Sequence, residues 1–254
     1  MDGGYQTRDD TPFYSVGYLR ERDDLRNPKA QLRKEVANAM ARVSVRAWRR
    51  LSLRLHLGYE WRRFSDGERR SALPPMSQVF GTDWAGWDEG LGAFHGALAV
   101  AWGGRLGRLL PAPGVRANLR AAMWAGGDRV NRLVQLGGRL EAFAAFDGGF
   151  QRLGLRGWVT GIGGWHGPVP LVYLPQLGGR RTMRGFPAGR FRGETVAWLA
   201  LEYYAALHPR LWLSLFVDWG GAWRERFGAH GWDRLDVSGG GWLGLRIAPG
   251  FWLH

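Results

Sequence analysis

The sequence contains no cysteine, which excludes disulfide bonds, thiolate metal sites and cysteine nucleophiles. Lysine is nearly absent too. Only Lys29 and Lys34 occur, so the formal net charge of +13 comes almost entirely from arginine. Long hydrophobic runs are also missing: the longest apolar stretch, 196–207, is interrupted by Glu202 and is shorter than the roughly 20 residues that a membrane-spanning helix needs. No transmembrane helix is therefore predicted.

Signatures of enzymes are equally scarce. The six histidines are scattered without the spacing of metal ligands, and neither an H-E-x-x-H nor a G-x-S-x-G pattern occurs. Residues 161–164 resemble a dinucleotide-binding loop only distantly, and a glycine-rich strand end is the simpler interpretation. We therefore predict that the protein is not an enzyme and has no catalytic residues, metal site or cofactor.

Glycine and tryptophan are the residues in excess. The chain of 254 residues holds 40 glycines and 15 tryptophans, and 45% of its residues are hydrophobic. Because glycine weakens a helix by about 1 kcal/mol per residue, this bias favours strands, bulges and turns. The length suits one β-barrel or one to two ordinary domains.

Residues 51–61 alternate between apolar and polar side chains, as a strand with one apolar and one polar face does. The apolar positions are Leu51, Leu53, Leu55, Leu57, Tyr59 and Trp61. Residues 41–47 alternate in the same way, and only 48–50 separate the two segments, which predicts an antiparallel hairpin. The strands are about ten residues long, close to the ~9–11 of a tilted membrane strand.

The alternation continues along the chain. It predicts further strands at 115–123, 135–144 and 211–219, and less regular ones at about 12–20, 93–103, 150–162, 195–207 and 237–247. Roughly ten strands joined in order are typical of an all-β, antiparallel up-and-down barrel. The long loops, 64–91 and 164–193, are expected at one end of it.

The polar face of these strands is rich in arginine, which bears on whether the barrel lies in a membrane. The arginines expected to line the lumen are Arg42, Arg46, Arg54, Arg116 and Arg120. The apolar face ends in aromatic residues, as membrane-interface girdles do. This favours a membrane barrel, but a soluble sheet protein also alternates, and an arginine-rich soluble protein that binds nucleic acid is the alternative from another class.

The alternation of side chains along residues 211–219 predicts the position of one charged residue, Asp218. Asp218 alternates with Leu213, Leu215 and Val217, so it faces the lumen if those side chains face lipid. A buried carboxylate requires a partner, and Arg184, on the preceding loop beside a glycine, can approach closely. Glu202 lies on the strand between them. The competing interpretation is a solvated arginine and a water-exposed aspartate in a wide pore.

Three segments in this region carry a family resemblance: Gly178-Gly179-Arg180-Arg181-Thr182-Met183-Arg184-Gly185-Phe186 with 189–193, then Glu202-Tyr203, then Phe216-Val217-Asp218-Trp219-Gly220. They closely resemble the C-terminal half of the BamA/TamA-type barrel family, also called bacterial surface antigens. The close match covers about 174–247, and upstream only the strand pattern is similar.

The resemblance implies a role for each residue of this region. A long loop, here 164–193 and called the motif loop, would fold back into the lumen, where Arg184 would pair with Glu202 and Asp218. The motif residues are Arg184, Gly185, Phe186, Gly189 and Gly193, with Phe216 and Gly220 in support. The glycines would permit close backbone approach.

The same resemblance implies a location and a function. The chain would be a transmembrane barrel of the bacterial outer membrane that assembles or inserts outer-membrane proteins or translocates polypeptides. Expected partners are outer-membrane lipid and lipopolysaccharide, unfolded or secreted client polypeptides and periplasmic assembly proteins, but not nucleic acid. A two-partner secretion pore, which shares the motif loop, is the alternative within transport.

The sequence also departs from the family pattern. Tyr204 follows Glu202-Tyr203 where the family usually has arginine, and neither POTRA domains nor a signal peptide is recognisable. About four early strands and the last two strands of a sixteen-stranded barrel are unaccounted for. We therefore expect residues 1–254 to form a single barrel domain or a fragment of one, with about ten to twelve strands.

Overall fold

A computed structural model describes residues 2–13, 30–66, 73–84, 87–103, 111–126, 132–165, 167–208, 210–224, 235–248 and 251–253. Within these residues, no helix is long and apolar enough to cross a membrane.

The main feature of the fold is one antiparallel sheet of eleven strands that are hydrogen-bonded almost entirely in chain order. Its strands are β1 (Asp2–Phe13), β2 (Ala30–Arg46), β3 (Leu51–Asp66), β4 (Leu91–Gly103), β5 (Gly114–Gly126), β6 (Leu133–Phe146), β7 (Gln151–Gly164), β10 (Thr195–His208), β11 (Leu211–Trp223), β12 (Asp236–Ala248) and β13 (Phe251–Leu253). The short strands β8 (Gln176–Leu177) and β9 (Phe191–Arg192) form a separate pair.

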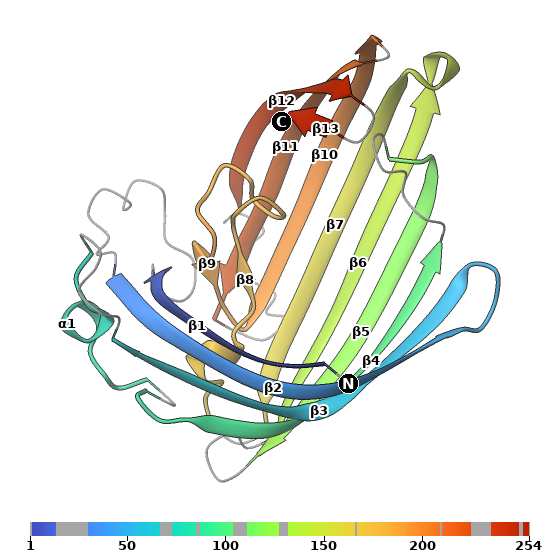
Figure 1. The fold of residues 1–254 in the computed structure, drawn as a ribbon. Helices are drawn as coiled ribbons and strands as arrows, with labels where there is room; N and C mark the ends of the chain where they lie inside the picture. The colour runs from blue at the N-terminus through green and yellow to red at the C-terminus, as the bar shows by residue number, and fades with distance from the viewer. Residues whose placement is uncertain are drawn as a thin grey trace.

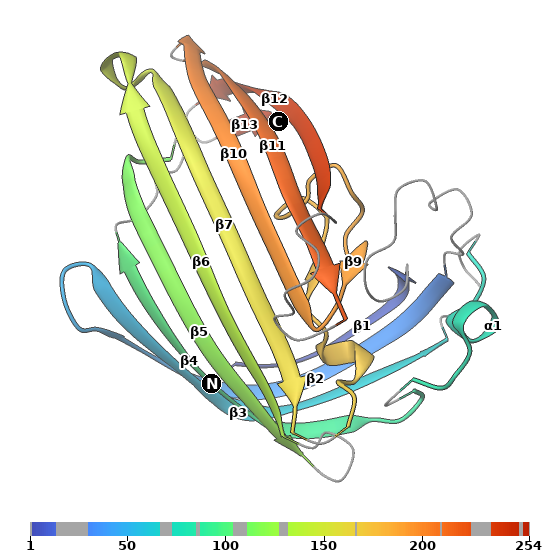
Figure 2. The same cartoon turned by 180° about the vertical axis from the view of Figure 1, so that it is seen from behind.

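The predicted all-β, up-and-down architecture and the number of strands are confirmed. The sheet is strongly curved, with β1 at one edge and β13 at the other (Figures 1 and 2). No pairing between these two edge strands occurs in the described residues, so the sheet is open and corresponds to part of a barrel.

The prediction for the two edge strands of the sheet was incomplete. A strand was expected at about 12–20; residues 12–13 form the end of β1, and 14–20 lie outside the described residues. Residues 2–13 are mostly polar and show no alternation of apolar and polar side chains, so the sequence pattern did not predict β1. The strand is defined by its backbone pairing with β2. The short strand β13 was not predicted at all.

Alternation along the strands gives the sheet two different faces. Apolar side chains stay exposed on the convex face, including Leu53, Leu55, Leu57, Phe94, Leu98, Leu119, Leu136, Leu140, Leu155, Val159, Leu199, Leu201 and Leu215. Strand register places Leu53, Val100 and Leu119 side by side in one outer row. The concave face instead holds buried carboxylates, among them Glu60, Glu202 and Asp218. The sheet is therefore apolar outside and charged inside.

Both long loops extend from the same end of the sheet, as predicted, because β3 and β7 run in the same direction. The β3–β4 loop contains α1 (Met76–Phe80), and the β7–β10 loop contains η3 (Leu171–Tyr173), β8 and β9. At this end, loop residues such as Met76 and Leu171 share one apolar cluster with Phe64, Leu91 and Trp124 of the strands. The β7–β10 loop folds inward over part of the concave face, whereas α1 of the β3–β4 loop lies at the rim, beside the ends of β2 and β3 (Figures 1 and 2).

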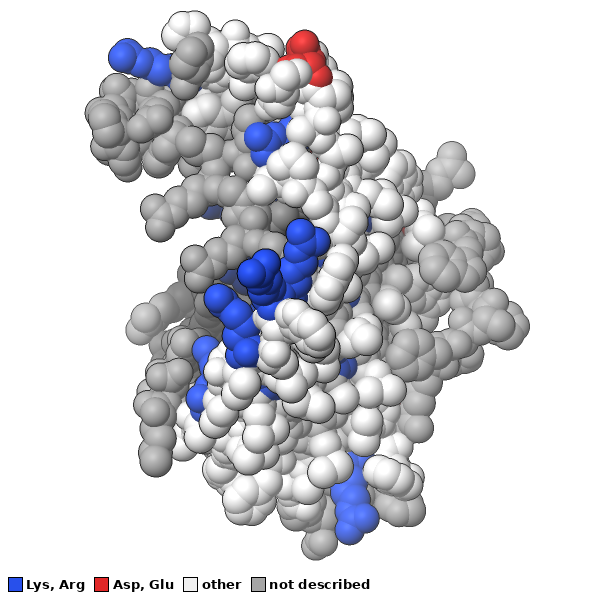
Figure 3. Space-filling model, turned by 90° about the vertical axis from the view of Figure 1, so that its right-hand side faces the viewer, with Lys and Arg blue, Asp and Glu red and all other residues white. Residues whose placement is uncertain are grey.

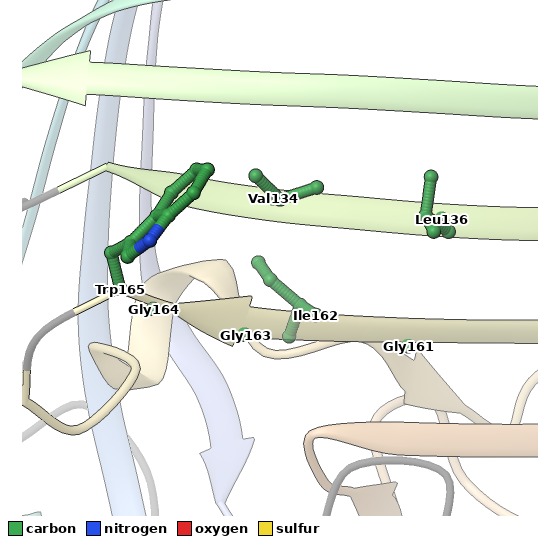
Figure 4. A pocket seen from close by; sticks show the side chains of 7 residues that line it. All are labelled: Val134, Leu136, Gly161, Ile162, Gly163, Gly164 and Trp165. Carbon is green, nitrogen blue, oxygen red and sulfur yellow. The ribbon is translucent and has the colours of Figure 1, made fainter.

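A groove of about 360 Å³ interrupts the apolar surface between β6 and β7. Figure 4 shows the side chains of Val134, Leu136 and Trp165 beside a glycine-rich part of β7. Gly161 pairs with Leu136, and the neighbouring glycines of β7 likewise present no side chain. The segment that distantly resembles a dinucleotide-binding loop is thus the glycine-rich end of a strand.

A glycine in the β2–β3 hairpin provides a test of the close strand packing. A methyl group at Gly58 would lie 2.3 Å from the carbonyl oxygen of Ala39 and 2.8 Å from the Cα of Met40. Because both obstacles are backbone atoms, we expect Gly58→Ala to lower the free energy of unfolding by about 1–3 kcal/mol. Gly96→Ala is the matched control, since its methyl group would meet only Leu57 Cδ2, at 3.5 Å. Urea unfolding in detergent, followed by tryptophan fluorescence, measures both, and equal losses would contradict the assigned register.

Candidate functional site

The motif loop turns back along the concave face of the sheet. Its strands β8 and β9 pair with each other and lie against β11 (Figure 1). Between them the backbone makes tight turns: the amide of Gly179 donates to the carbonyl of Phe186 at 2.8 Å, and the amide of Phe186 donates to that of Met183 at 3.0 Å. Met183 has a φ of 50° and is fully buried. This turn places Arg184 directly above β10 and β11.

Arg184 is bound to Glu202 and Asp218, the two carboxylates predicted from the sequence as its partners. Its Nε and Nη2 donate to the two oxygens of Asp218 at 3.0 and 2.7 Å, and its Nη1 donates to Glu202 Oε1 at 2.6 Å. The backbone amide of Arg184 also donates to Asp218, at 2.8 Å. The guanidinium carbon lies 3.7 Å from the ring centroid of Phe216, which closes one side of the group.

The burial of these three charged side chains determines how strongly their ion pairs affect the stability of the docked loop. The side chains of Glu202 and Asp218 have no exposed area, and that of Arg184 is 8% exposed. Burial alone would lower the pKa of the Arg184 guanidinium, but hydrogen bonds and charge from Asp218 and Glu202 outweigh it and raise the pKa. Because removing one partner would leave a buried charge without its counter-ion, the ion pair favours this position of the loop.

The pair extends into a chain of alternating charges along the concave face. Arg156 of β7 lies 3.3 Å from Glu202 and 3.8 Å from Glu141 of β6, which in turn pairs with Arg139 at 2.7 Å. We call this set the charge chain; its members are Arg139, Glu141, Arg156, Glu202, Arg184 and Asp218. Three cations face three anions, so the charge chain is neutral.

Five arginines of β2, β3 and β5 differ from those of the charge chain. Arg42, Arg46, Arg54, Arg116 and Arg120 were the side chains predicted to line the lumen. In the part of the chain that the structure describes, no carboxylate lies within 4 Å of any of them. This side of the concave face thus carries positive charge that is not locally balanced.

Glycines allow the motif loop to come this close to the strands. A Cβ at Gly185 would lie 2.6 Å from the Cβ of Ser238, and one at Gly193 would lie 2.2 Å from the carbonyl oxygen of Trp223. A Cβ at Gly220 would lie 2.8 Å from both Met183 Sδ and the carbonyl oxygen of Ala197. Gly189 has a φ of 75°, a conformation that other residues rarely adopt.

Apolar contacts hold the rest of the turn. Phe186 packs edge to face on Phe191 of β9 at 5.0 Å. Together with Trp158 it borders a buried apolar cluster that contains Leu177, Met183, Phe191, Val196, Trp198, Ala200 and Ala222. The apolar cluster and the buried ion pair therefore fix the same turn from two sides.

A second contact holds the motif loop to the opposite part of the sheet. Arg62 of β3 donates to the carbonyl of Val172 at 2.7 Å, and its guanidinium carbon lies 4.6 Å from the ring centroid of Tyr173. Arg62 also pairs with Glu60 at 3.1 Å, and the Trp124 indole donates to the same carboxylate. The motif loop thus bridges the concave face, from β3 through η3 to β11 through Arg184.

Sequence reasoning missed several of these side chains. Arg156 and Tyr204 both bind Glu202, and the Tyr204 hydroxyl donates to Oε2 at 2.8 Å. Tyr204 was noted only as a departure from the family pattern, yet here the hydroxyl and Arg156 together occupy the second oxygen of Glu202. Strand phase could have indicated both residues, but the contacts of Arg62 depend on how the loop folds and leave no sequence signal.

Comparisons with known proteins support the fold. No family model and no curated protein matches the sequence. Among solved structures, the chain is similar to the crystal structure of BamA from Haemophilus ducreyi lacking POTRA domains 1–3, with a TM-score of 0.65 and 16% sequence identity. The match covers 85% of this chain and 49% of the BamA chain, so the two share the fold over about half of that protein. The chain therefore has the fold of part of a BamA-type barrel.

The buried ion pair makes a specific prediction for stability. Asp218→Ala removes the partner of Arg184 Nε and Nη2 and leaves three cations facing two anions in the charge chain. We therefore expect the free energy of unfolding to fall by roughly 3–5 kcal/mol. Trypsin should then cut faster at Arg180 and Arg181, which are exposed on the motif loop. Asp88→Asn is the control, because Asp88 is 58% exposed and pairs with Arg63 at 2.6 Å, and asparagine tolerates the φ of 51° at this position. Loss of that surface pair should cost less than about 1 kcal/mol. Equal effects of the two variants would count against a locked loop.

The contact between Gly185 and Ser238 gives a second prediction, in which a second substitution should restore the docking of the loop. Gly185→Ala should weaken the docking of the motif loop, since the new methyl group would overlap the Ser238 side chain. The double variant Gly185→Ala/Ser238→Gly removes that obstacle and should recover most of the resistance to trypsin. If the double variant cleaves as fast as the single one, the loop does not rest on β12 at this point.

Proposed function

We propose that this chain is an outer-membrane barrel of the BamA/TamA-type family that takes part in inserting outer-membrane proteins or translocating polypeptides. The observation that carries the proposal is the motif loop, folded onto the concave face of a BamA-like sheet and bound there through Arg184. The residues of this contact are those on which the family resemblance rests. In this proposal Arg184 is the brace, and Glu202 and Asp218 are its counter-ions.

The distribution of apolar and charged side chains supports a place in a membrane. In water, the exposed Leu, Val and Phe side chains of the convex face would form a very large apolar surface, but in a bilayer they contact acyl chains. Between β1 and β13, backbone groups are paired strand to strand, as they are within the wall of a membrane barrel. We propose that residues 1–254 form a barrel domain or a fragment of one in the bacterial outer membrane.

The site suggests a mechanism without covalent chemistry. The described residues contain no group of three His, Asp or Glu side chains that could hold a metal. The charge chain and the Arg62 contact hold the motif loop across the concave face, so the loop stiffens a sheet whose edges β1 and β13 are not joined. Client polypeptides, membrane lipid and periplasmic assembly proteins are the partners in this proposal. The motif loop would keep the sheet in the shape that receives a client.

Two alternatives predict different behaviour. A two-partner secretion pore would share the motif loop and would move one dedicated polypeptide across the membrane without inserting barrels. A soluble nucleic-acid binder would dissolve without detergent and would bind DNA with strong dependence on salt. The exposed apolar convex face argues against the soluble alternative.

The test is reconstitution into liposomes, with the folding of an added unfolded eight-stranded outer-membrane barrel as the readout. Heat-modifiable migration on gels measures the folded fraction. We expect the wild-type protein to raise the folding rate several-fold over empty liposomes, and Arg184→Ala to lose most of that gain. Arg181→Ala removes an exposed arginine from the same loop and serves as the control.

The heat-modifiable migration of each variant itself shows whether the variant is folded. Folded wild-type protein that gives no acceleration would overturn the insertion proposal, and transport of a co-expressed polypeptide would then favour the secretion pore. Recovery of the protein in the soluble fraction, bound to DNA, would favour the third candidate.

A further inference from the structure

A second site lies at the end of the sheet opposite to the motif loop. The β2–β3 hairpin turns at 47–50, and four arginines gather around this turn: Arg46, Arg49, Arg50 and Arg116. They line a cavity of about 550 Å³ whose walls also include Ser52 and Gly103. On the face shown in Figure 3, basic side chains form a cluster near the centre, while acidic side chains appear only at the top.

These four guanidinium groups form no ion pair with a carboxylate of the described residues. No carboxylate of the described residues lies within 4 Å of them, whereas Arg139, Arg156 and Arg184 of the charge chain each have at least one. Arg46, Arg49 and Arg50 are exposed and Arg116 is half-buried. Gathering four like charges without a counter-ion is unfavourable, so the site is suited to an external anion.

An apolar cavity adjoins the cationic one. It measures about 360 Å³ and is lined by Trp48, Arg49, Arg50, Leu51 and Trp102, all of which also line the first cavity. Leu51 and Trp102 are paired across β3 and β4, in the outward phase of both strands. Trp48 is 77% exposed and Trp102 45% exposed. The two cavities therefore place an apolar surface with two indoles directly beside four arginines.

We propose that this rim binds the phosphate group of an anionic glycerophospholipid. Arginine binds phosphate oxygens in bidentate fashion, and tryptophan prefers the level of lipid head groups at the membrane interface. The arginines would hold the phosphate while Trp48, Trp102 and Leu51 contact the glycerol and the first part of the acyl chains. The placement at the border of the apolar convex face favours a lipid over a free anion or a nucleic acid, which would need no apolar wall. The inference rests on the proposed membrane location but not on the insertion of clients.

The test measures binding of phosphatidylglycerol with a fluorescent acyl chain to the full chain in neutral detergent. We expect it to bind at least several-fold more tightly than the matching phosphatidylcholine, with an affinity that falls as salt is raised. The double variant Arg49→Gln/Arg50→Gln should lose on the order of 20-fold in affinity, since each arginine near anionic lipid contributes about fivefold. Arg180→Gln/Arg181→Gln removes the same charge from the opposite end and should bind as the wild type does.

Further measurements distinguish a phospholipid from a free phosphate and from a nucleic acid as the ligand of this site. Trp48→Ala should weaken binding of phosphatidylglycerol but leave the weaker binding of pyrophosphate unchanged. If inorganic phosphate or pyrophosphate displaces the lipid at equal concentration, the site binds free anions and the lipid proposal fails. Displacement by single-stranded DNA at lower concentration, or equal binding of the two phospholipids, would overturn it as well.

The outcome is independent of the client-folding assay. Binding is measured on folded protein, verified by heat-modifiable migration, and the two arginine variants leave Arg184 and its partners unchanged. Client folding without lipid selectivity would therefore refute the lipid site alone, and lipid selectivity without client folding would refute the insertion proposal alone.

Discussion

The burial of Arg184 between two carboxylates is the interaction on which the arrangement of the motif loop depends. None of the three charges is stable away from water by itself, so the loop must stay where it neutralises Glu202 and Asp218. The hydrogen bond from the Arg184 backbone amide to Asp218 fixes the loop chain as well as its side chain. Charge balance, and not apolar contact alone, thus selects the position of the loop.

This dependence follows from the inverted distribution of side chains in the sheet. Because Leu, Val and aromatic residues occupy most of the convex face, most of the charged groups of the strands are directed to the concave side. Ionised groups gathered there either pair with one another, as in the charge chain, or remain available to ions and ligands. The motif loop supplies the one cation, Arg184, that β10 and β11 do not provide for themselves.

Much of the fold could be predicted from the sequence, because alternation marks strands that have one face in each environment. Residues 51–61 and 211–219 were recognisable for that reason, whereas the polar β1 is defined only by its partner strand. The phase of Asp218 indicated a lumen position before any contact was known. The contacts of Arg62 could not be predicted, since they depend on the path of a loop that brings distant segments together. Arg156, by contrast, lies on the strand next to β10, and strand phase could have indicated it.

The separation of the concave face into two electrostatic halves has a consequence for anything that moves along it. Between β6 and β11 the members of the charge chain pair with one another, so their field decays within a short distance. On β2, β3 and β5, five arginines have no carboxylate within 4 Å in the described residues, and their potential reaches further from the wall; they are Arg42, Arg46, Arg54, Arg116 and Arg120. A negatively charged segment that entered the curve of the sheet would be drawn sideways toward β2–β5, away from the motif loop. The sheet would therefore orient a passing polyanion before touching it.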